Sequence, residues 1–213
     1  GKYIFEELKN FLNTNNYINK DWNALNILIQ NASTVGLIDL NIITNKGDDY
    51  TFFEKLSTNK FKFLYLLGSD NLQIKKENEF IVYQGSHGDR GAEIADVILP
   101  SAAFTEQNGL YENLEGRVQE SKKASYPIGE AKEDWRIFNI LIQKLGNKNE
   151  LLNFDLLRKE SLNSIQNFSK INELPEFKKV LNDKIKTEFV SEDINIKYLD
   201  YYFSNSISRS SKT

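Results

Sequence analysis

Residues 63–100 read FLYLLGSDNLQIKKENEFIVYQGSHGDRGAEIADVILP, and they carry the clearest signal of the architecture. Three short apolar runs, at 61–67, 80–83 and 96–99, end in a tight turn, a glycine-rich loop and a proline. Continuously apolar runs of strand length are typical of parallel strands covered on both faces. We therefore predict an α/β fold: a doubly wound, mostly parallel sheet with flanking helices, followed by a helical and extended C-terminal segment.

Amphipathic patterns precede these strands. In residues 3–11 the apolar side chains recur at helical spacing, which predicts a first helix. Asp21 is followed by Trp22 and further apolar residues, which predicts a second helix with Asp21 as its N-cap. We expect this second helical region to end near Gly36.

The Asp-Trp pattern occurs twice in the chain. Residues 21–30 read DWNALNILIQ, and residues 134–143 read DWRIFNILIQ. The second copy predicts a helix that is capped by Asp134 and stops at Gly146. We expect two similar helices packed on the same sheet, with an internally duplicated fold and a chance similarity of two helices as alternatives.

Less regular patterns follow. Residues 109–119 contain two glycine-punctuated stretches, which predict either a hairpin or an ordered loop. Residues 151–168 and 177–185 have helical spacing, and the serine-rich end at 204–213 is predicted to be extended.

The composition of the 213 residues favours a folded protein without cysteine chemistry. With 40% hydrophobic and 27% charged residues, the chain can bury a core. Its net charge of −3 argues against nucleic acid, because phosphate binding requires a clear basic excess. The absence of cysteine excludes disulfides and all-cysteine iron–sulfur sites in this chain, and a single histidine, His87, excludes zinc sites built from several histidines.

The sequence shows neither an apolar run long enough to span a membrane nor a signal peptide. It begins at Gly1 and contains no methionine. We therefore expect either a processed product or a piece of a longer polypeptide.

The loop from Gly85 to Gly91 is the first candidate site. Closely spaced glycines bring backbone N–H groups near a phosphate, but this spacing is that of neither a Rossmann fingerprint nor a P-loop. His87 lies in the loop near Asp89, and a histidine acts as a general base only with an orienting partner and a reacting group. We favour a tight turn that carries a surface histidine.

Glu106, Glu112, Glu115 and Arg117 form a second candidate cluster together with Asn113. Paired carboxylates perform acid–base chemistry when their environments separate their pKa values. A guanidinium that holds a carboxylate through two hydrogen bonds explains the same residues more economically. We therefore predict that Arg117 is largely buried and bonded to Glu106, to Glu115 or to backbone carbonyls.

The chain also resembles a known family. The runs at 83–92 (YQGSHGDRGA), 94–100 (IADVILP), 113–119 (NLEGRVQ) and 206–211 (SISRSS) are similar to the molybdopterin-oxidoreductase-related domain of the large iron–sulfur subunit of respiratory complex I. The resemblance extends over nearly the whole chain and is strongest at 63–146.

The resemblance implies a doubly wound α/β domain with a structural role in NADH:ubiquinone oxidoreductase. In molybdoenzymes of the superfamily a Gly-x-Asn-Pro turn lies near the pterin, whereas the turn at 68–72 has one more residue and no proline. We therefore carry over no catalytic, cofactor-binding or metal-binding residue, and expect this chain to bind no metal or organic cofactor. The iron–sulfur clusters are expected on the missing N-terminal part of the subunit or on a partner chain.

The same resemblance implies partners and a location. The partners are other peripheral-arm subunits, including the cluster-binding N-terminal part of the same subunit, with no nucleic acid and no direct membrane span. The location is the matrix side of the mitochondrial inner membrane, with the cytoplasmic face of a bacterial membrane as the alternative. We expect a partial α/β domain at 1–146 and a helical segment with a C-terminal docking tail at 147–213.

Two other functions compete with this one: a fragment of an active molybdopterin oxidoreductase, and a stand-alone nucleotide-binding module. We also expect that the chain is not a self-sufficient monomer, because three strands are few for a sheet of this class. The aromatic residues at 198–203 and the tail to Thr213 are expected to run along a neighbouring subunit or along the N-terminal part of the same one.

Overall fold

The structure is a computed structural model that describes residues 2–19, 21–29, 31–42, 55–56, 58, 61–69, 72, 74–146, 153–164, 170–175, 188–189, 191, 202–203 and 205–211. In chain order its elements are α1 (Lys2–Thr14), α2 (Thr34–Asp39), β1 (Phe63–Leu67), β2 (Phe80–Gly85), α4 (Arg90–Glu93), β3 (Val97–Pro100), β4 (Gly109–Glu112), β5 (Val118–Ser121), α5 (Asp134–Lys144), α6 (Phe154–Ser164) and α7 (Ser206–Ser210). The helix predicted at 177–185 lies outside the described residues.

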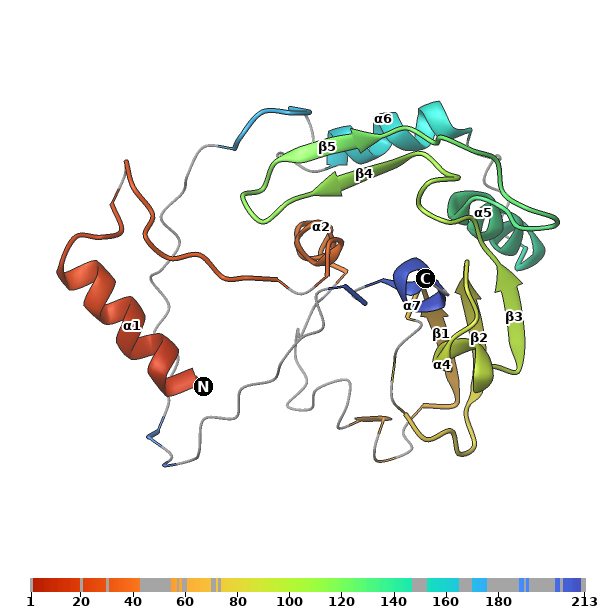
Figure 1. The fold of residues 1–213 in the computed structure, drawn as a ribbon, viewed down its shortest axis with the longest axis horizontal. Coiled ribbons are helices and arrows are strands. Elements are labelled where there is room, and N and C mark those ends of the chain that lie inside the picture. The colour runs from red at the N-terminus through yellow and green to blue at the C-terminus, as the bar shows by residue number, and fades with distance from the viewer. Residues whose placement is uncertain are drawn as a thin grey trace.

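The three apolar runs form one parallel sheet in the order β1-β2-β3 (Figure 1). The register of β1 and β2 starts at Phe63 opposite Phe80, and that of β2 and β3 starts at Val82 opposite Val97. Helices flank this sheet, so the predicted α/β class is confirmed.

The core is centred on strand β2, which pairs with another strand along each of its two edges. Its side chains Ile81 and Tyr83 are buried and pack against Leu64 and Leu66 of β1. Each buried side chain of this size contributes roughly 1.5–3 kcal/mol. Cover on both faces was predicted, but β1 alternates between buried and exposed positions and leaves Phe63 half-exposed.

An antiparallel hairpin follows the sheet. β4 pairs with β5 from Gly109 opposite Ser121 to Glu112 opposite Val118, so the hairpin alternative is the correct one. Its turn contains Gly116 at φ +80°, a left-handed conformation that glycine adopts without strain.

The helix predicted after Asp134 is present as α5. Ile137 is buried, and the ring of Phe138 lies 5.6 Å from that of Tyr65 in β1. The helix ends before Gly146, which has φ +83°. Glu133, not Asp134, occupies the N-cap position, so the predicted capping role of Asp134 is wrong.

The helix predicted at Asp21 does not form. The side-chain carbonyl of Asn19 accepts hydrogen bonds from the backbone N–H groups of Asp21 and Trp22, so the local turn is built by Asn19. Residues 21–29 contain no helix, and Gly36 lies inside α2 rather than at the end of a helical region. The expected pair of similar helices on one sheet is therefore wrong. Trp22 is 65% exposed.

The tail also differs from expectation. Residues 206–210 form the short helix α7 and not an extended segment, because Asn205 and Ser208 make a reciprocal capping box. Of the aromatic residues at 198–203, the structure describes Tyr202 and Phe203, and both are exposed. Among the described residues, the helices are all too short or too polar to cross a bilayer.

Candidate functional site

Polar side chains gather where the parallel strands end. Gln84 belongs to the end of β2, Ser101 follows β3, and Asp134 begins α5. The Oδ1 atom of Asp134 accepts hydrogen bonds from Gln84 Nε2 at 2.6 Å and Ser101 Oγ at 2.7 Å. Its Oδ2 atom accepts one from Gln107 Nε2 at 2.9 Å, and its backbone N–H donates to Gln107 Oε1 at 3.1 Å. This Asp134 network joins β2, β3 and α5 through one carboxylate.

The network extends to β1 through Tyr65, whose hydroxyl donates to the side-chain carbonyl of Gln84. Burial, and next the negative charge of Asp134, raise the pKa of Tyr65 and also that of Tyr111. Tyr65 therefore keeps its proton at neutral pH and acts as a donor. Because these donors point at protein acceptors, the network holds strand ends together and presents no group poised to attack a substrate.

The Gly85–Gly91 loop packs tightly against the sheet. The Tyr83 hydroxyl donates to the backbone carbonyl of His87 at 2.9 Å. A Cβ atom on Gly91 would lie 2.6 Å from the carbonyl oxygen of Ser69, so glycine is needed for close approach of two loops. The ring of His87 contacts Ser86 Oγ at 2.9 Å, and in the described part of the chain no hydrogen bond joins it to Asp89. The loop is thus a packed turn.

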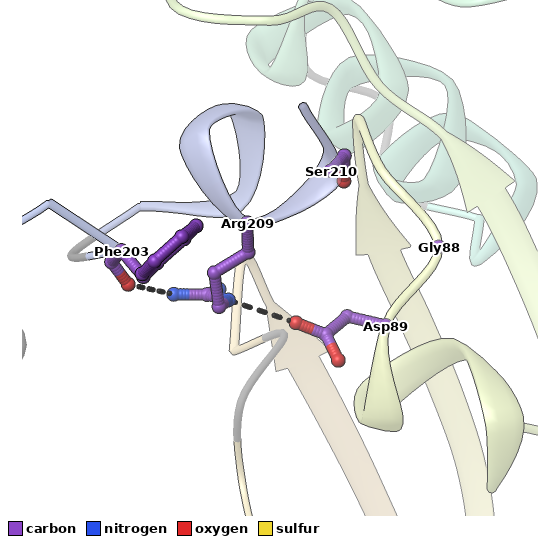
Figure 2. Close-up of a pocket in the computed structure, with 5 residues that line it drawn as sticks. All are labelled: Gly88, Asp89, Phe203, Arg209 and Ser210. Atoms are coloured by element: carbon purple, nitrogen blue, oxygen red, sulfur yellow. Dashed lines mark hydrogen bonds and ion pairs between the residues drawn. The ribbon is translucent and has the colours of Figure 1, made fainter. Parts of the chain in front are cut away.

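The C-terminal helix α7 lies against this loop (Figure 2). Arg209 Nε donates to Asp89 Oδ2 at 3.0 Å across 120 residues of sequence, and Arg209 Nη1 donates to the carbonyl of Phe203 at 3.2 Å. The backbone N–H of Arg90, and then Arg209, lower the pKa of Asp89. This part of the tail therefore contacts the chain's own α/β domain, and the expected contact with a neighbouring subunit or with the N-terminal part of the same one stays a prediction.

The predicted ion pair of Arg117 does not form. Glu106 accepts a hydrogen bond from the backbone N–H of Ala103, and Glu115 lies beside the side-chain amide of Asn113. Within the described residues, Arg117 Nε is buried and has no hydrogen-bond partner. The Asn113 side-chain carbonyl already binds the backbone N–H groups of Glu115 and Arg117, which closes the turn without a guanidinium.

A second polar cluster surrounds Glu133 and was not predicted. Its carboxylate is buried and binds Lys123 Nζ at 3.0 Å and Trp135 Nε1 at 2.6 Å. Burial acts to raise the pKa of Glu133, but the hydrogen bonds from Trp135 and Lys123 outweigh it and leave the pKa lowered. The only sequence signal was the i, i+3 spacing of Glu133 and Arg136.

The Glu133 cluster borders an open cavity of about 760 Å³. The lining residues are Lys123, Tyr126, Pro127, Ala131, Lys132, Glu133, Trp135, Arg136, Asn139, Ile140 and Asn153. Three of them are cations and one is an anion, but two of the cations, Lys123 and Arg136, already lie near Glu133. The charged part of the cavity wall is therefore largely a structural ion cluster.

The residues at the strand ends do not fit a bound pterin. The side-chain donors of Gln84, Ser101 and Gln107 bind Asp134. After β1, Gly68 has φ +60° and donates its N–H to the carbonyl of Gln84, so this turn is also used for packing. Among the described residues, no three histidine, cysteine or acidic side chains gather where they could hold a metal ion.

Known proteins resemble the whole chain. It is 38% identical to the NADH-ubiquinone oxidoreductase 75 kDa subunit of Reclinomonas americana, 37% to an NADH-quinone oxidoreductase subunit of Rickettsia bellii, and 36% to the mitochondrial NADH-ubiquinone oxidoreductase 78 kDa subunit of Candida albicans. These alignments include 100%, 100% and 93% of this chain, but only 31%, 30% and 28% of the relatives. The chain thus spans less than a third of the relatives' length.

The family model for molybdopterin oxidoreductase matches residues 1–144, which include the parallel sheet, the Asp134 network and α5. This is more than half of the chain and agrees with the resemblance carried by the strand-end motifs. The chain therefore belongs to the molybdopterin oxidoreductase family.

Proposed function

We propose that the chain is a non-catalytic structural segment from the C-terminal part of the large iron–sulfur subunit of NADH:ubiquinone oxidoreductase, where it supports electron transfer from NADH to quinone. The observation that carries the proposal is the similarity of the whole chain to subunits named for that enzyme. The names of these relatives do not favour a fragment of an active molybdopterin oxidoreductase.

The geometry supports a structural role. Asp134 and its donors connect the strand ends to α5, and α7 lies on the loop after β2. In the loop after β2, Ser86 Oγ lies 2.9 Å from His87 Nδ1, but among the described residues no second hydrogen bond orients the His87 ring as a catalytic base requires. Neither arrangement presents a cradle for a cofactor at the edge where ligands of open α/β sheets bind. The chain then contributes no catalytic, cofactor-binding or metal-binding residue. The iron–sulfur clusters belong to the rest of the subunit or to a partner chain, because this chain has no cysteine.

The proposed partners are other subunits of the peripheral arm, including the cluster-binding N-terminal part of the same subunit. The proposed location is the matrix side of the mitochondrial inner membrane, since one relative is named as mitochondrial. The cytoplasmic face of a bacterial membrane is the alternative, because another relative comes from Rickettsia.

Purification of an affinity-tagged chain from the source cells tests this function. We expect the tagged chain to co-purify with NADH:ubiquinone oxidoreductase activity on a native gel, whereas the isolated chain shows no iron–sulfur absorbance and no stoichiometric metal. Recovery of the chain without that activity would refute the role in this enzyme. Stoichiometric molybdenum or a bound pterin would instead support the rival molybdoenzyme.

A further inference from the structure

One sequence pattern adopts two structures in this chain. Residues 21–30 and 134–143 share Asp, Trp, Asn, Ile, Leu, Ile and Gln at matching positions. The second copy is the helix α5. The described part of the first copy, residues 21–29, contains no helix. An isolated helix of this length is marginal in water, so packing decides which structure such a sequence adopts.

The second copy shows what packing the pattern requires. Asp134 is bound by Gln84 and Ser101 at the ends of parallel strands. One turn later Ile137 is buried, and Phe138 packs on Tyr65 of β1. The pattern is therefore suited to a helix whose first carboxylate receives amide and hydroxyl donors, and whose apolar face lies on a parallel sheet.

Among the described residues, the first copy has no comparable packing. Leu28 is 88% exposed, and Trp22 and Ile27 are also exposed. Asp21 is exposed as well, and its backbone N–H is held by Asn19. Large apolar side chains exposed close together in sequence indicate a contact surface.

The preceding helix α1 presents the same kind of surface. Ile4, Leu8 and Phe11 follow the i, i+4, i+7 spacing of one helix face and are exposed. The polar pair Glu6 and Lys9, joined at 2.8 Å, is instead buried, with 8% of each side chain exposed. A helix at the surface of a complete globular domain normally buries its apolar stripe. α1 also lies at the end of the molecule away from the β1–β3 sheet (Figure 1).

We infer that residues 21–29 fold into an α-helix when they dock on the remainder of the large subunit. That remainder supplies the ends of parallel strands, with amide or hydroxyl donors for Asp21, and the face formed by Ile4, Leu8 and Phe11 packs against it. This inference rests on the proposed function and specifies the docking surface and the partner.

Two observations identify the occupant as the rest of the subunit. The chain spans 31% of the Reclinomonas relative, so roughly two-thirds of that protein's length lies outside the match. Among the described residues the parallel sheet has three strands, fewer than the usual 5–6 or so. A lipid surface fits less well, because α1 carries two lysines and two glutamates, and membrane-surface helices are rich in basic residues.

Substitutions at Asn26 test the inference, because this side chain is exposed and no described residue accepts a hydrogen bond from its N–H. Tagged variants of the full chain are expressed beside the untagged wild type, and the tagged-to-untagged ratio is measured in the purified oxidoreductase. We expect Asn26→Pro to lower that ratio about 100-fold, because proline breaks a helix interior. Asn26→Ala should leave it unchanged or raise it, because alanine favours helix.

Two exposed leucines give a matched comparison of surface position. Leu28→Asp should reduce incorporation at least about 10-fold by burying a charge at the interface. Leu145→Asp, at an equally exposed leucine (86%) beyond the end of α5, should not. Amide exchange at residues 21–29 should slow at least about 10-fold on assembly.

Each outcome has a distinct meaning. If the wild-type chain does not enter the oxidoreductase, the proposed function fails. If the wild type enters and Asn26→Pro enters equally well, or if amides at 21–29 stay unprotected after assembly, the inference is overturned while the function stands. Binding of the wild-type chain, but not Leu28→Asp, to anionic phospholipid vesicles with no change in assembly would also overturn it, in favour of a lipid surface.

Discussion

The carboxylate of Asp134 accepts a hydrogen bond of 2.6 Å from the side-chain amide of Gln84, which lies fifty residues earlier in the chain. This contact attaches the first residue of α5 to the end of the central strand β2. Because Gln84 is fully buried, the bond forms away from water and removal of one partner leaves the other unsatisfied.

Substitution of Asp134 by asparagine should destabilise the fold although the side chain keeps its shape. Gln107 is held in one orientation, because its Oε1 atom accepts the Asp134 backbone N–H. An amide nitrogen at the Oδ2 position would then face the donor Gln107 Nε2. We expect Asp134→Asn to lower the free energy of unfolding by about 1.5–3 kcal/mol, as for hydrogen bonds to charged groups. Urea unfolding measures the change.

The matched control is Asp155→Asn in the first turn of α6, where the aspartate is exposed. Its effect should stay below about 1 kcal/mol, the usual limit for a charge near a helix N-terminus. Equal effects at the two positions would show that Asp134 acts through the helix dipole and not through its network.

Removal of the Tyr65 hydroxyl should also destabilise the sheet. Tyr65→Phe leaves the buried side-chain carbonyl of Gln84 without its donor. The expected loss is about 1–3 kcal/mol in the free energy of unfolding. Tyr126→Phe, at an exposed tyrosine, is the control and should be nearly neutral. Thermal unfolding followed by circular dichroism distinguishes the two variants, and indistinguishable midpoints would contradict this role of Tyr65.

Gly91 should not tolerate alanine. The added Cβ would lie 2.6 Å from the backbone oxygen of Ser69, and the segments that carry Gly91 and Ser69 both follow strands of the parallel sheet. We expect Gly91→Ala to destabilise the chain by about 1–3 kcal/mol, the usual range for overpacking. Gly88→Ala is a close control in the same loop, since a Cβ atom added there would have no atom within 4 Å. A stable Gly91→Ala protein would contradict the tight contact between the two loops.

The docking of α7 should depend on pH through Asp89. Hydrogen bonds from the Arg90 backbone and from Arg209 lower the folded-state pKa of this carboxyl group. Its contribution is therefore complete above the ordinary aspartate pKa of about 3.9 and is lost as the pH falls through the lowered folded-state value. We expect amide exchange at residues 205–211 to accelerate over that acidic range, relative to the intrinsic exchange rate.

Two variants check the origin of this pH dependence. Asp89→Asn should free α7 at neutral pH and remove the acid transition, because it loses the charge that Arg209 binds. Glu93→Gln, on the exposed surface of the adjacent helix α4, should change neither the docking of α7 at neutral pH nor the acid transition. If the acid transition persists in Asp89→Asn, a group other than Asp89 causes the pH dependence.

The parallel strands could be predicted from local sequence, because short, continuous apolar runs are typical of parallel strands. Helix α1 could likewise be predicted from the helical spacing of its apolar residues, and Gly146 indicated the end of α5. The polar site was not visible in the same way. Gln84, Ser101 and Asp134 are far apart in the sequence and meet only because parallel strands end at one edge.

The Arg117 prediction failed for a related reason. Charges close in sequence suggested an ion pair, but the hairpin register places the Asn113 side chain where it binds the turn's backbone N–H groups. Conversely, the contact between Asp89 and Arg209 joins two motifs of the family resemblance across 120 residues, which no local pattern indicates.

The two Asp-Trp segments separate most clearly what the sequence specifies from what the tertiary structure decides. Their residues specify the same amphipathic helix with the same acidic start, and local propensity is nearly equal for both. Only residues 134–144 form that helix, because the ends of β2 and β3 supply donors for Asp134 and β1 supplies an aromatic surface for Phe138. Residues 21–29 have the same pattern, but in the described part of the chain their large apolar side chains Trp22, Ile27 and Leu28 stay exposed. The sequence therefore specifies which face a helix would bury, and tertiary contacts determine whether the helix exists, since burial provides the free energy that a short helix lacks in water.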